Sequence, residues 1–368
     1  MSVCTKRYLS LALCLFLLCL MNLLTLQASV HCRASDYEVK IEAAELMDRC
    51  MARIRDHKAL RGIPMSPEDL LNTGLIGEEF NGLTTTLGPV EGKRTAADPN
   101  MAAMAVQLLR EAGVTPGDRV GAVLSGSFPG LDLAVLCACA ALEVDLDYMT
   151  SAGSSTFGAN WPLLTFPEIA CLLAEDGLLP APPMAWSLGG HRDCGLDMDP
   201  RLTDQVRDRM DKLGIPFLYE EDFSANLARR MELLQQDGPL RCFVGVGGNL
   251  TVSGNADREL GCGLLSGLQP LHIDEHSGLL EIYSSMGLPV IYLLNIKNLA
   301  AEYGLPYDPP SHTAPGSGPL YEEIRYPIWP CILGTAASLA LLWYTGRHSA
   351  AHKKECCNFE CGRNHSDH

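Results

Sequence analysis

The chain has 368 residues, of which 47% are hydrophobic and 20% are charged. These values argue against a disordered chain and are sufficient for a substantial core. The formal net charge is −16, and no run of Lys and Arg is present. This balance argues against nucleic acid as a partner, because phosphate binding needs a basic patch.

The first apolar segment, residues 8–26, contains no charged residue and follows Lys6 and Arg7. About 20 apolar helical residues cross a bilayer, so residues 1–30 are predicted to form a transmembrane anchor. The alternative is a cleaved signal peptide, because residues 26–28 resemble a small-residue cleavage site. The apolar stretch is longer than the usual core of a signal peptide, which favours the anchor.

A second apolar segment, residues 328–346, predicts a C-terminal transmembrane helix. Trp329 and Trp343 flank it, as aromatic residues do at the two surfaces of a bilayer, and Arg347 follows it. A buried core helix is the alternative. Positive charge outside both spans predicts a cell-membrane protein with both termini in the cytoplasm and an extracytoplasmic domain between them.

Fifteen cysteines are present, and eight of them lie between the two predicted spans. An even number outside the cytoplasm is compatible with disulfides. However, Cys137, Cys139 and Cys171 lie on apolar helical stretches, and Cys242 begins an apolar strand. Buried cysteine commonly acts as a small hydrophobic residue, so we expect mostly reduced core cysteines.

The N-terminal part of the domain, residues 31–97, is predicted to be helical and rich in loops. Apolar residues recur at helical spacing over 37–60, and Gly62 follows that helix. Ser66 and Pro67 predict the start of a second, short helix that ends near Gly74. A long loop then spans 75–98, and loops of this length are uncommon unless they are functional or mobile.

Residues 98–307 show strands that alternate with helices. This order predicts an α/β domain with a mainly parallel, Rossmann-like sheet and helices on both faces, in three layers. The segment 308–327, rich in Pro, Gly and Ser, is predicted to be a linker, and 347–368 a polar tail. Strands are expected at 119–124, 144–149, 183–187, 216–219, 242–246 and 288–295.

Small polar loops follow four of these strands. In open α/β sheets, ligands bind beyond the carboxyl ends of the strands, and backbone amides in such loops can hold an anion. We therefore predict a shared binding site there, although glycine and serine also occur in such loops as turn and cap residues. The candidate ligand-binding residues are Lys93, Arg94, Ser125, Gly126, Ser127, Ser154, Ser155, Asn160, Gly247, Gly248 and Asn249.

Ser127 lies between a strand and a helix, where a nucleophilic serine would lie, and it is the candidate catalytic residue. The surrounding residues do not form a Gly-x-Ser-x-Gly motif, and Ser127 could instead cap the following helix. Lys93 and Arg94 are the candidate cations for a carboxylate. No P-loop or dinucleotide-type glycine motif is present, so no cofactor is assigned, and the cysteines and histidines of the tail fit no zinc pattern.

Several segments together resemble the poly-γ-glutamate system protein family, over about residues 38 to 310. They are KIEAAELMDRC at 40–50, NTGLIGEEF at 72–80, TTTLG at 84–88, KRT at 93–95, SGSFPG at 125–130, GSSTFGANW at 153–161 and GVGGN at 245–249. The resemblance implies an envelope protein that accompanies the machinery for synthesis and export of a poly-γ-glutamate capsule. The high cysteine count and the tail depart from that pattern.

Our leading hypothesis is an accessory protein of this system that binds the polymer or a γ-glutamyl end through the strand-end loops, because these loops together with Lys93 and Arg94 could hold an anion. Membrane-bound synthase or export components are the expected partners. One alternative is a serine-dependent amide hydrolase or transferase that acts on the polymer through Ser127. Another is a structural partner of the synthase without catalytic activity. Whether the protein is an enzyme remains open at the level of the sequence.

Overall fold

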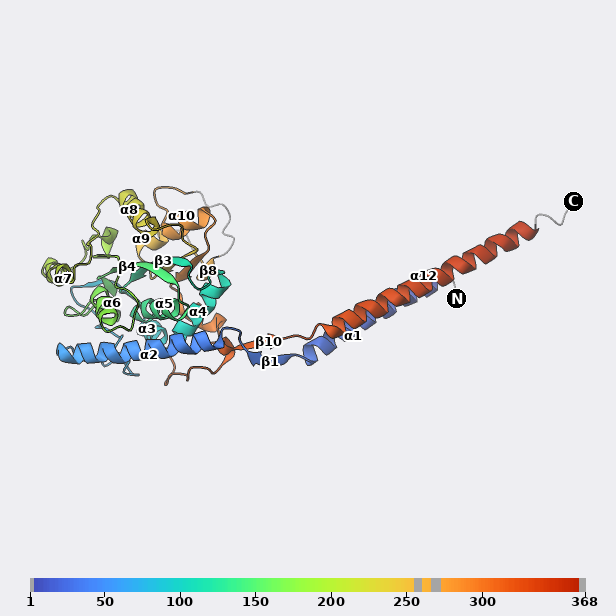
Figure 1. Ribbon diagram of the computed structural model, residues 1–368, viewed down its shortest axis with the longest axis horizontal. Coiled ribbons are helices and arrows are strands. Elements are labelled where there is room, and N and C mark those ends of the chain that lie inside the picture. The colour runs from blue at the N-terminus through green and yellow to red at the C-terminus, as the bar shows by residue number, and fades with distance from the viewer. Residues whose placement is uncertain (1–2, 255–259, 266–272, 364–368) are drawn as a thin grey trace. The chain divides into compact units, whose positions relative to one another are not determined.

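The computed structural model describes residues 3–254, 260–265 and 273–363. It divides into two compact units, Ala34–Tyr321 and the combination of Met1–Arg33 with Glu322–His368. The first unit is an α/β domain, and the second contains two long helices (Figure 1).

A six-stranded sheet forms the centre of the α/β unit, with strand order β6-β4-β3-β7-β9-β8. Five strands are parallel and only β8 is antiparallel, so the predicted mainly parallel sheet is confirmed. The strands are β3 (Arg119–Ser125), β4 (Asp145–Ser151), β6 (Ala185–Ser187), β7 (Cys242–Val246), β8 (Gly263–Leu265) and β9 (Val290–Leu293).

Helices cover both faces of this sheet, which gives three layers (Figure 1). Along β3, Val120, Ala122 and Leu124 belong to one buried cluster and Val123 to another, as side chains of a strand alternate between faces. The first cluster packs under α2 (Tyr37–Leu60), α4 (Asn100–Glu111), α5 (Pro129–Ala141) and α6 (Phe166–Glu175). The second packs under α8 (Phe223–Gln235) and α10 (Leu279–Ser285), while α7 (Pro200–Leu213) packs beside β6.

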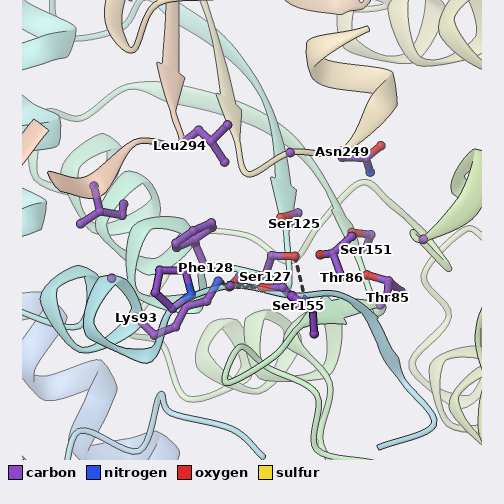
Figure 2. A pocket seen from close by; sticks show the side chains of 18 of the residues that line it. Thr85, Thr86, Lys93, Ser125, Ser127, Phe128, Ser151, Ser155, Asn249 and Leu294 are labelled. Atoms are coloured by element: carbon purple, nitrogen blue, oxygen red, sulfur yellow. Dashed lines mark hydrogen bonds between the residues drawn. The ribbon is translucent and has the colours of Figure 1, made fainter. Parts of the chain in front are cut away.

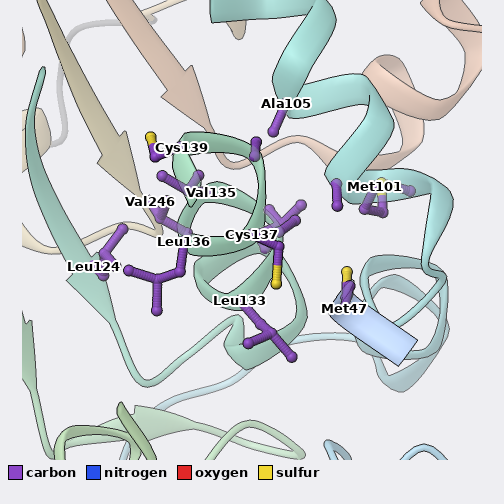
Figure 3. Close-up of a cluster of buried hydrophobic side chains, with 14 of the residues drawn as sticks. Met47, Met101, Ala105, Leu124, Leu133, Val135, Leu136, Cys137, Cys139 and Val246 are labelled. Carbon is purple, nitrogen blue, oxygen red and sulfur yellow. The ribbon is translucent and has the colours of Figure 1, made fainter. Parts of the chain in front are cut away.

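The central helix α5 is apolar all round because it is buried between the sheet and other helices. Its two cysteines fill the core: Cys137 lies among side chains that include Met47, and Cys139 lies toward β7 (Figure 3). Cys137, Cys139, Cys171 and Cys242 are all buried and free. The predicted position of these four residues in the core is therefore confirmed.

A second, two-stranded parallel sheet brings distant segments together. It pairs β2 (Thr84–Thr86) with β5 (Ser154–Ser155). The short helix α3 (Val90–Ala96) follows β2 and lies within the stretch that the sequence analysis predicted to be a loop. This arrangement places α3 next to the residues that follow β3 and β4.

Three segments differ from prediction. Residues 66–74 form turns rather than a helix, because the Asp69 carboxylate accepts hydrogen bonds from the backbone amides of Thr73 and Gly74. Residues 216–219 form a single bridge to β6 instead of a strand. Residues 308–321, part of the predicted linker, lie on the α/β unit, where the buried Tyr321 donates a hydrogen bond of 2.6 Å to Asn100.

The other unit joins the two ends of the described chain. Strand β1 (Val30–Arg33) pairs antiparallel with β10 (Glu322–Arg325). Helix α1 (Val3–Gln27) packs along α12 (Trp329–Arg363), and Gly334 of α12 lies against Met21 of α1. Helix α12 continues through the predicted polar tail as far as Arg363, and residues 364–368 lie outside the described part of the chain.

Among the described residues, one helix is long and apolar enough to cross a membrane, and it spans Tyr8–Gln27. This segment coincides with the predicted N-terminal span. Helix α12 does not meet the same measure of length and composition, so a second span stays a prediction.

Candidate functional site

A cavity of about 820 Å³ lies at the carboxyl edge of the central sheet. Residues that end or follow β3, β4, β6, β7 and β9 all line it, together with the segment from Thr85 to Lys93. Parallel strands end at the same edge of a sheet, and this edge is where α/β proteins bind ligands. The polar loops that the sequence analysis singled out thus converge at one place.

Hydroxyl and amide groups dominate the polar lining of the cavity (Figure 2). Such groups can donate hydrogen bonds to an anion or to a carbonyl oxygen. Among the described residues, two lysines and one histidine are the basic residues of the lining, and Asp197 is its one acidic residue. The side chains are Thr85, Thr86, Ser125, Ser127, Ser151, Ser155, Asn249 and Asn295, with Lys93, Lys297 and His191.

Lys93 extends from α3 to the floor of this cavity and is 2% exposed. Its ammonium donates hydrogen bonds to the backbone carbonyl of Ser127 and, over 2.7 Å, to Oγ of Ser155. It also lies 3.3 Å from the ring centre of Phe128. Burial lowers the pKa of Lys93 to about 7, because desolvation disfavours the charged form.

Asp132 lies in the first turn of α5 and is fully buried. Within the described part of the chain, neither carboxylate oxygen has a hydrogen-bond partner of ordinary geometry. Burial raises the pKa of Asp132 well above its usual value, and the charge of Lys93 and the backbone of Ser125 only partly counter this shift. Asp132 and Lys93 therefore influence each other without forming an ion pair.

Ser125 ends β3 and is 4% exposed, yet its hydroxyl has no hydrogen-bond partner among the residues that the structure describes. Gly247, with φ of +83°, passes so close that a Cβ there would come within 2.2 Å of this hydroxyl. Glycine is thus required at position 247 both by its φ and by the contact. An unpaired hydroxyl that lines a cavity is available to a ligand.

A strained loop after β6 forms another wall of the cavity. Arg192 and Asp193 both have positive φ, 54° and 63°, which costs about 1–3 kcal/mol for each such residue. The fully buried Asp193 is held by Arg230 at 2.5 Å and by the hydroxyl of Ser187 at 2.8 Å. Asn249 also donates to Asp193 over 3.3 Å, so one carboxylate ties together the loops after β6 and β7.

Six of the predicted binding residues line the cavity together. They are Lys93, Ser125, Ser127, Ser155, Gly248 and Asn249. The other predicted residues of these loops lie next to this group. Oγ of Ser154 donates to the backbone carbonyl of Gly126 over 2.8 Å, and Gly247 lies against the side chain of Ser125.

Two predicted residues have other contacts. Arg94, next to Lys93 on α3, forms an ion pair with Asp308 at 2.7 Å and another with Glu68 at 3.2 Å. Asn160 is buried, and its side chain joins the backbone of Glu78 to the hydroxyl of Thr84. Neither Arg94 nor Asn160 belongs to the lining of the cavity.

Ser127 does not cap α5, contrary to one of the two predictions for it. The residue before the helix is Phe128, and Oγ of Ser127 instead accepts a hydrogen bond of 3.0 Å from the backbone amide of Ser155. Among the described residues, no side-chain base is hydrogen-bonded to the Ser127 hydroxyl.

Sequence analysis missed several residues of this site. Asp132 could have been recognised from the sequence, because it is the only charged residue in the apolar segment 129–141. A carboxylate is costly to bury, so its presence in such a segment indicates a functional or specifically bonded side chain. Asn295 ends the predicted strand 288–295 and Lys297 follows it, so both residues could have been assigned to a strand-end loop in the same way as the other four loops. Thr85 and Thr86 were recognised only as part of a long loop.

No group of three or more His, Cys, Asp or Glu side chains that could hold a metal ion occurs within the described ranges. Comparison of the chain with protein-family models, with curated proteins and with solved structures gives no significant match. Function therefore has to be argued from the cavity itself.

Proposed function

We propose that this chain is a membrane-anchored accessory protein that binds poly-γ-glutamate, or a γ-glutamyl end, in the cavity at the carboxyl edge of its sheet. The observation that carries this proposal is the lining: it gathers hydroxyls, amides and lysines around one space, and the buried hydroxyl of Ser125 has no hydrogen-bond partner among the described residues. Carboxylates are recognised by such donors. The resemblance to the poly-γ-glutamate system family supports this choice of ligand.

The net charge of −16 restricts where on the surface a polyanion can bind. A polyanion is repelled by an acidic surface, so contact is favoured only where donors and lysines are concentrated. Lys297 is exposed at the rim, whereas Lys93 is buried at the floor. An extended chain end can therefore meet the rim cation first and the buried residues afterwards.

Membrane attachment is part of the same proposal. The apolar α1 supports an anchor, and its packing along α12 favours an uncleaved helix over a signal peptide. We propose that α12 is a second span, that both termini are cytoplasmic and that the α/β unit is extracytoplasmic, beside membrane-bound synthase or export components. A purely structural partner of the synthase is the alternative, and it requires no ligand in the cavity.

Binding can be measured on the full-length protein in detergent micelles by fluorescence polarisation of a labelled γ-glutamyl oligomer. We expect saturable binding that weakens about tenfold or more in Lys297→Met, the equivalent of about 1.4 kcal/mol. Arg94→Ala should retain the affinity, because Arg94 is engaged by Asp308 and Glu68. Lys212→Met, a change on the exposed part of α7, is the matched control for loss of a positive charge.

Unlabelled α-linked polyglutamate serves as competitor, because it carries the same charge with a different backbone. Weaker competition by the α-linked chain supports recognition of the γ-linkage. Absence of saturable binding would reject the proposal and leave the structural partner.

A further inference from the structure

The proposed binding function does not require that Ser155 and Lys93 contact each other. Ser155 lies on β5 and Lys93 on α3, and their side chains meet at 2.7 Å on the wall of the cavity (Figure 2). A serine hydroxyl at hydrogen-bond distance from a lysine amine is the arrangement of serine–lysine acyl hydrolases and transferases. We propose that Ser155 is a nucleophile and Lys93 its general base, and that they act on an amide or ester bound in this cavity.

The surroundings of Lys93 suit a base rather than a permanent cation. Its amine contacts a backbone carbonyl, a hydroxyl and the face of Phe128, and in the described structure no carboxylate is within ion-pair distance. Burial without an ion pair lowers its pKa to about 7, so that close to half of the molecules carry a neutral amine near neutral pH. A neutral amine can accept the proton of the Ser155 hydroxyl.

Local structure holds the two groups in place. The backbone amide of Ser155 donates to Oγ of Ser127, and the carbonyl of Ser127 accepts from Lys93. Ser127 thus orients both partners, while its own hydroxyl already accepts a hydrogen bond. Oγ of Ser155 also donates to the carbonyl of Ser127 over 3.5 Å, but among the described contacts it is the hydroxyl of Ser155, and not that of Ser127, that meets the amine of Lys93, which favours Ser155 as the nucleophile.

Lys93 and Ser155 are only 2% and 4% exposed, and the side on which they border the cavity is the one beside Gly88. A Cβ added at Gly88 would be 3.6 Å from Nζ of Lys93 and 3.6 Å from Oγ of Ser155. Without that atom, both reactive groups border the cavity. A substrate carbonyl in the cavity can therefore approach Ser155 from the side of Gly88.

The chemistry balances with water as the only co-reactant. Oγ of Ser155 bonds to the carbonyl carbon of the amide while Lys93 takes the hydroxyl proton. The C–N bond then breaks, Lys93 returns the proton to the leaving nitrogen, and an ester on Ser155 remains. Water attacks that ester with Lys93 as base, its C–O bond breaks and Ser155 regains a proton, so the products are an amine and a carboxylic acid. An amine acceptor in place of water gives transfer.

The inference rests on the proposed function only for the identity of the substrate, a γ-linked glutamyl amide. Reactivity of the pair can be tested without that polymer. Full-length protein in detergent micelles is treated with an alkyl fluorophosphonate between pH 6 and 9, and the modified serine is identified by mass spectrometry of peptides.

We expect labelling at Ser155, with a rate that rises with pH and has its midpoint near pH 7. Labelling should disappear in Ser155→Ala and become about 100-fold slower in Lys93→Met, as loss of a general base usually costs about 10²–10⁴-fold. Lys93→Arg keeps the charge without an available base and should be equally slow. Ser127→Ala removes the hydroxyl that accepts from the Ser155 amide, so labelling should stay at Ser155 but become slower; the exposed Ser285→Ala and Lys212→Met are matched controls.

Three results would overturn the inference: no modification of Ser155 at pH 8, modification of Ser127 in its place, or equal rates in wild type and Lys93→Met. Circular dichroism of each variant excludes misfolding, and Ser155→Cys with a thiol reagent provides a second test of the same base. Chain length of poly-γ-glutamate after incubation is measured separately. Labelled Ser155 with an uncut and unbound polymer would refute the proposed ligand but leave the pair intact.

Discussion

Two buried charged clusters lie next to the lining of the same cavity, one through the contact of Asp193 with Asn249 and the other through Lys93, and they differ in how well their charges are paired. Asp193 is held by Arg230, Ser187, Asn226 and Asn249, and both members of its ion pair are at most 1% exposed. By contrast, Lys93 has no ion pair in the described structure, and Asp132 has no hydrogen bond of ordinary geometry.

This difference in charge pairing indicates different roles for the two clusters. A fully bonded buried ion pair fixes the surrounding backbone, and this one holds the strained loop at Arg192 and Asp193. A buried lysine without an ion pair has a lowered pKa and stays available for proton transfer. The loop cluster is therefore structural, and the lysine cluster is the reactive part of the site.

The largest effect is expected from Arg230→Met, which removes one partner of the buried ion pair. Asp193 would be left as an uncompensated buried charge, so the free energy of unfolding should fall by about 3–5 kcal/mol. Urea denaturation in micelles, followed by fluorescence of the buried Trp186, measures this change. Arg229→Met, on the exposed face of the same helix, is the control and should change stability by less than about 0.5 kcal/mol. Equal losses of unfolding free energy in Arg230→Met and Arg229→Met would contradict the structural role of the Asp193–Arg230 ion pair.

Sequence patterns predicted the helices and strands of the α/β unit better than the residues of its site. Helix α2 spans the predicted 37–60, and β3 and β7 lie within two residues of prediction. These elements have long apolar or periodic stretches, which report burial directly. The short β8 and the helix α10 have no such pattern and were not predicted.

The site depended on contacts that no local pattern encodes. Lys93 and Arg94 are neighbours in sequence, but successive residues on a helix point about 100° apart, so on α3 one enters the cavity and the other meets Asp308. Because this segment was predicted to be a loop, the two cations could not be distinguished. Likewise, the contact of Lys93 with Ser155 spans 62 residues and depends on the pairing of β2 with β5.

The second prediction concerns the pH dependence of stability that Lys93 contributes. In the folded protein its pKa is about 7, whereas in the unfolded chain it is near 10.5, so the unfolded chain binds more protons between these values. Stability therefore rises with pH in that window, by about 2–3 kcal/mol from pH 6 to pH 9. Lys93→Met should abolish this rise, as measured by urea denaturation at both pH values. Lys212→Met should retain it, and a rise that persists in Lys93→Met would show that another group is responsible.

A smaller effect is expected from Asp132→Asn, which removes a negative charge that raises the pKa of Lys93. The pKa of Lys93 should then fall further, and the midpoint of fluorophosphonate labelling should move by about half a pH unit or more to lower pH. Asn has nearly the same volume, so the change tests charge rather than packing. An unchanged midpoint would mean that Asp132 is protonated in the folded protein and exerts no field on Lys93.

The smallest change in stability, but a clear change in reactivity, is expected from Gly88→Ala. Gly88 does not have a positive φ, and the new Cβ would meet Lys93 and Ser155 at ordinary contact distance, so stability should stay within about 0.5 kcal/mol. The methyl group nevertheless covers the side from which a substrate reaches Ser155, and labelling by the fluorophosphonate should slow by about tenfold. Gly346→Ala on α12, where no described atom beyond its chain neighbours and the local helix backbone lies within 4 Å of the added Cβ, is the matched control. Since Gly88→Ala leaves both reactive groups in place, slower labelling with an unchanged pH midpoint would show that access from the cavity, and not the basicity of Lys93, had been altered.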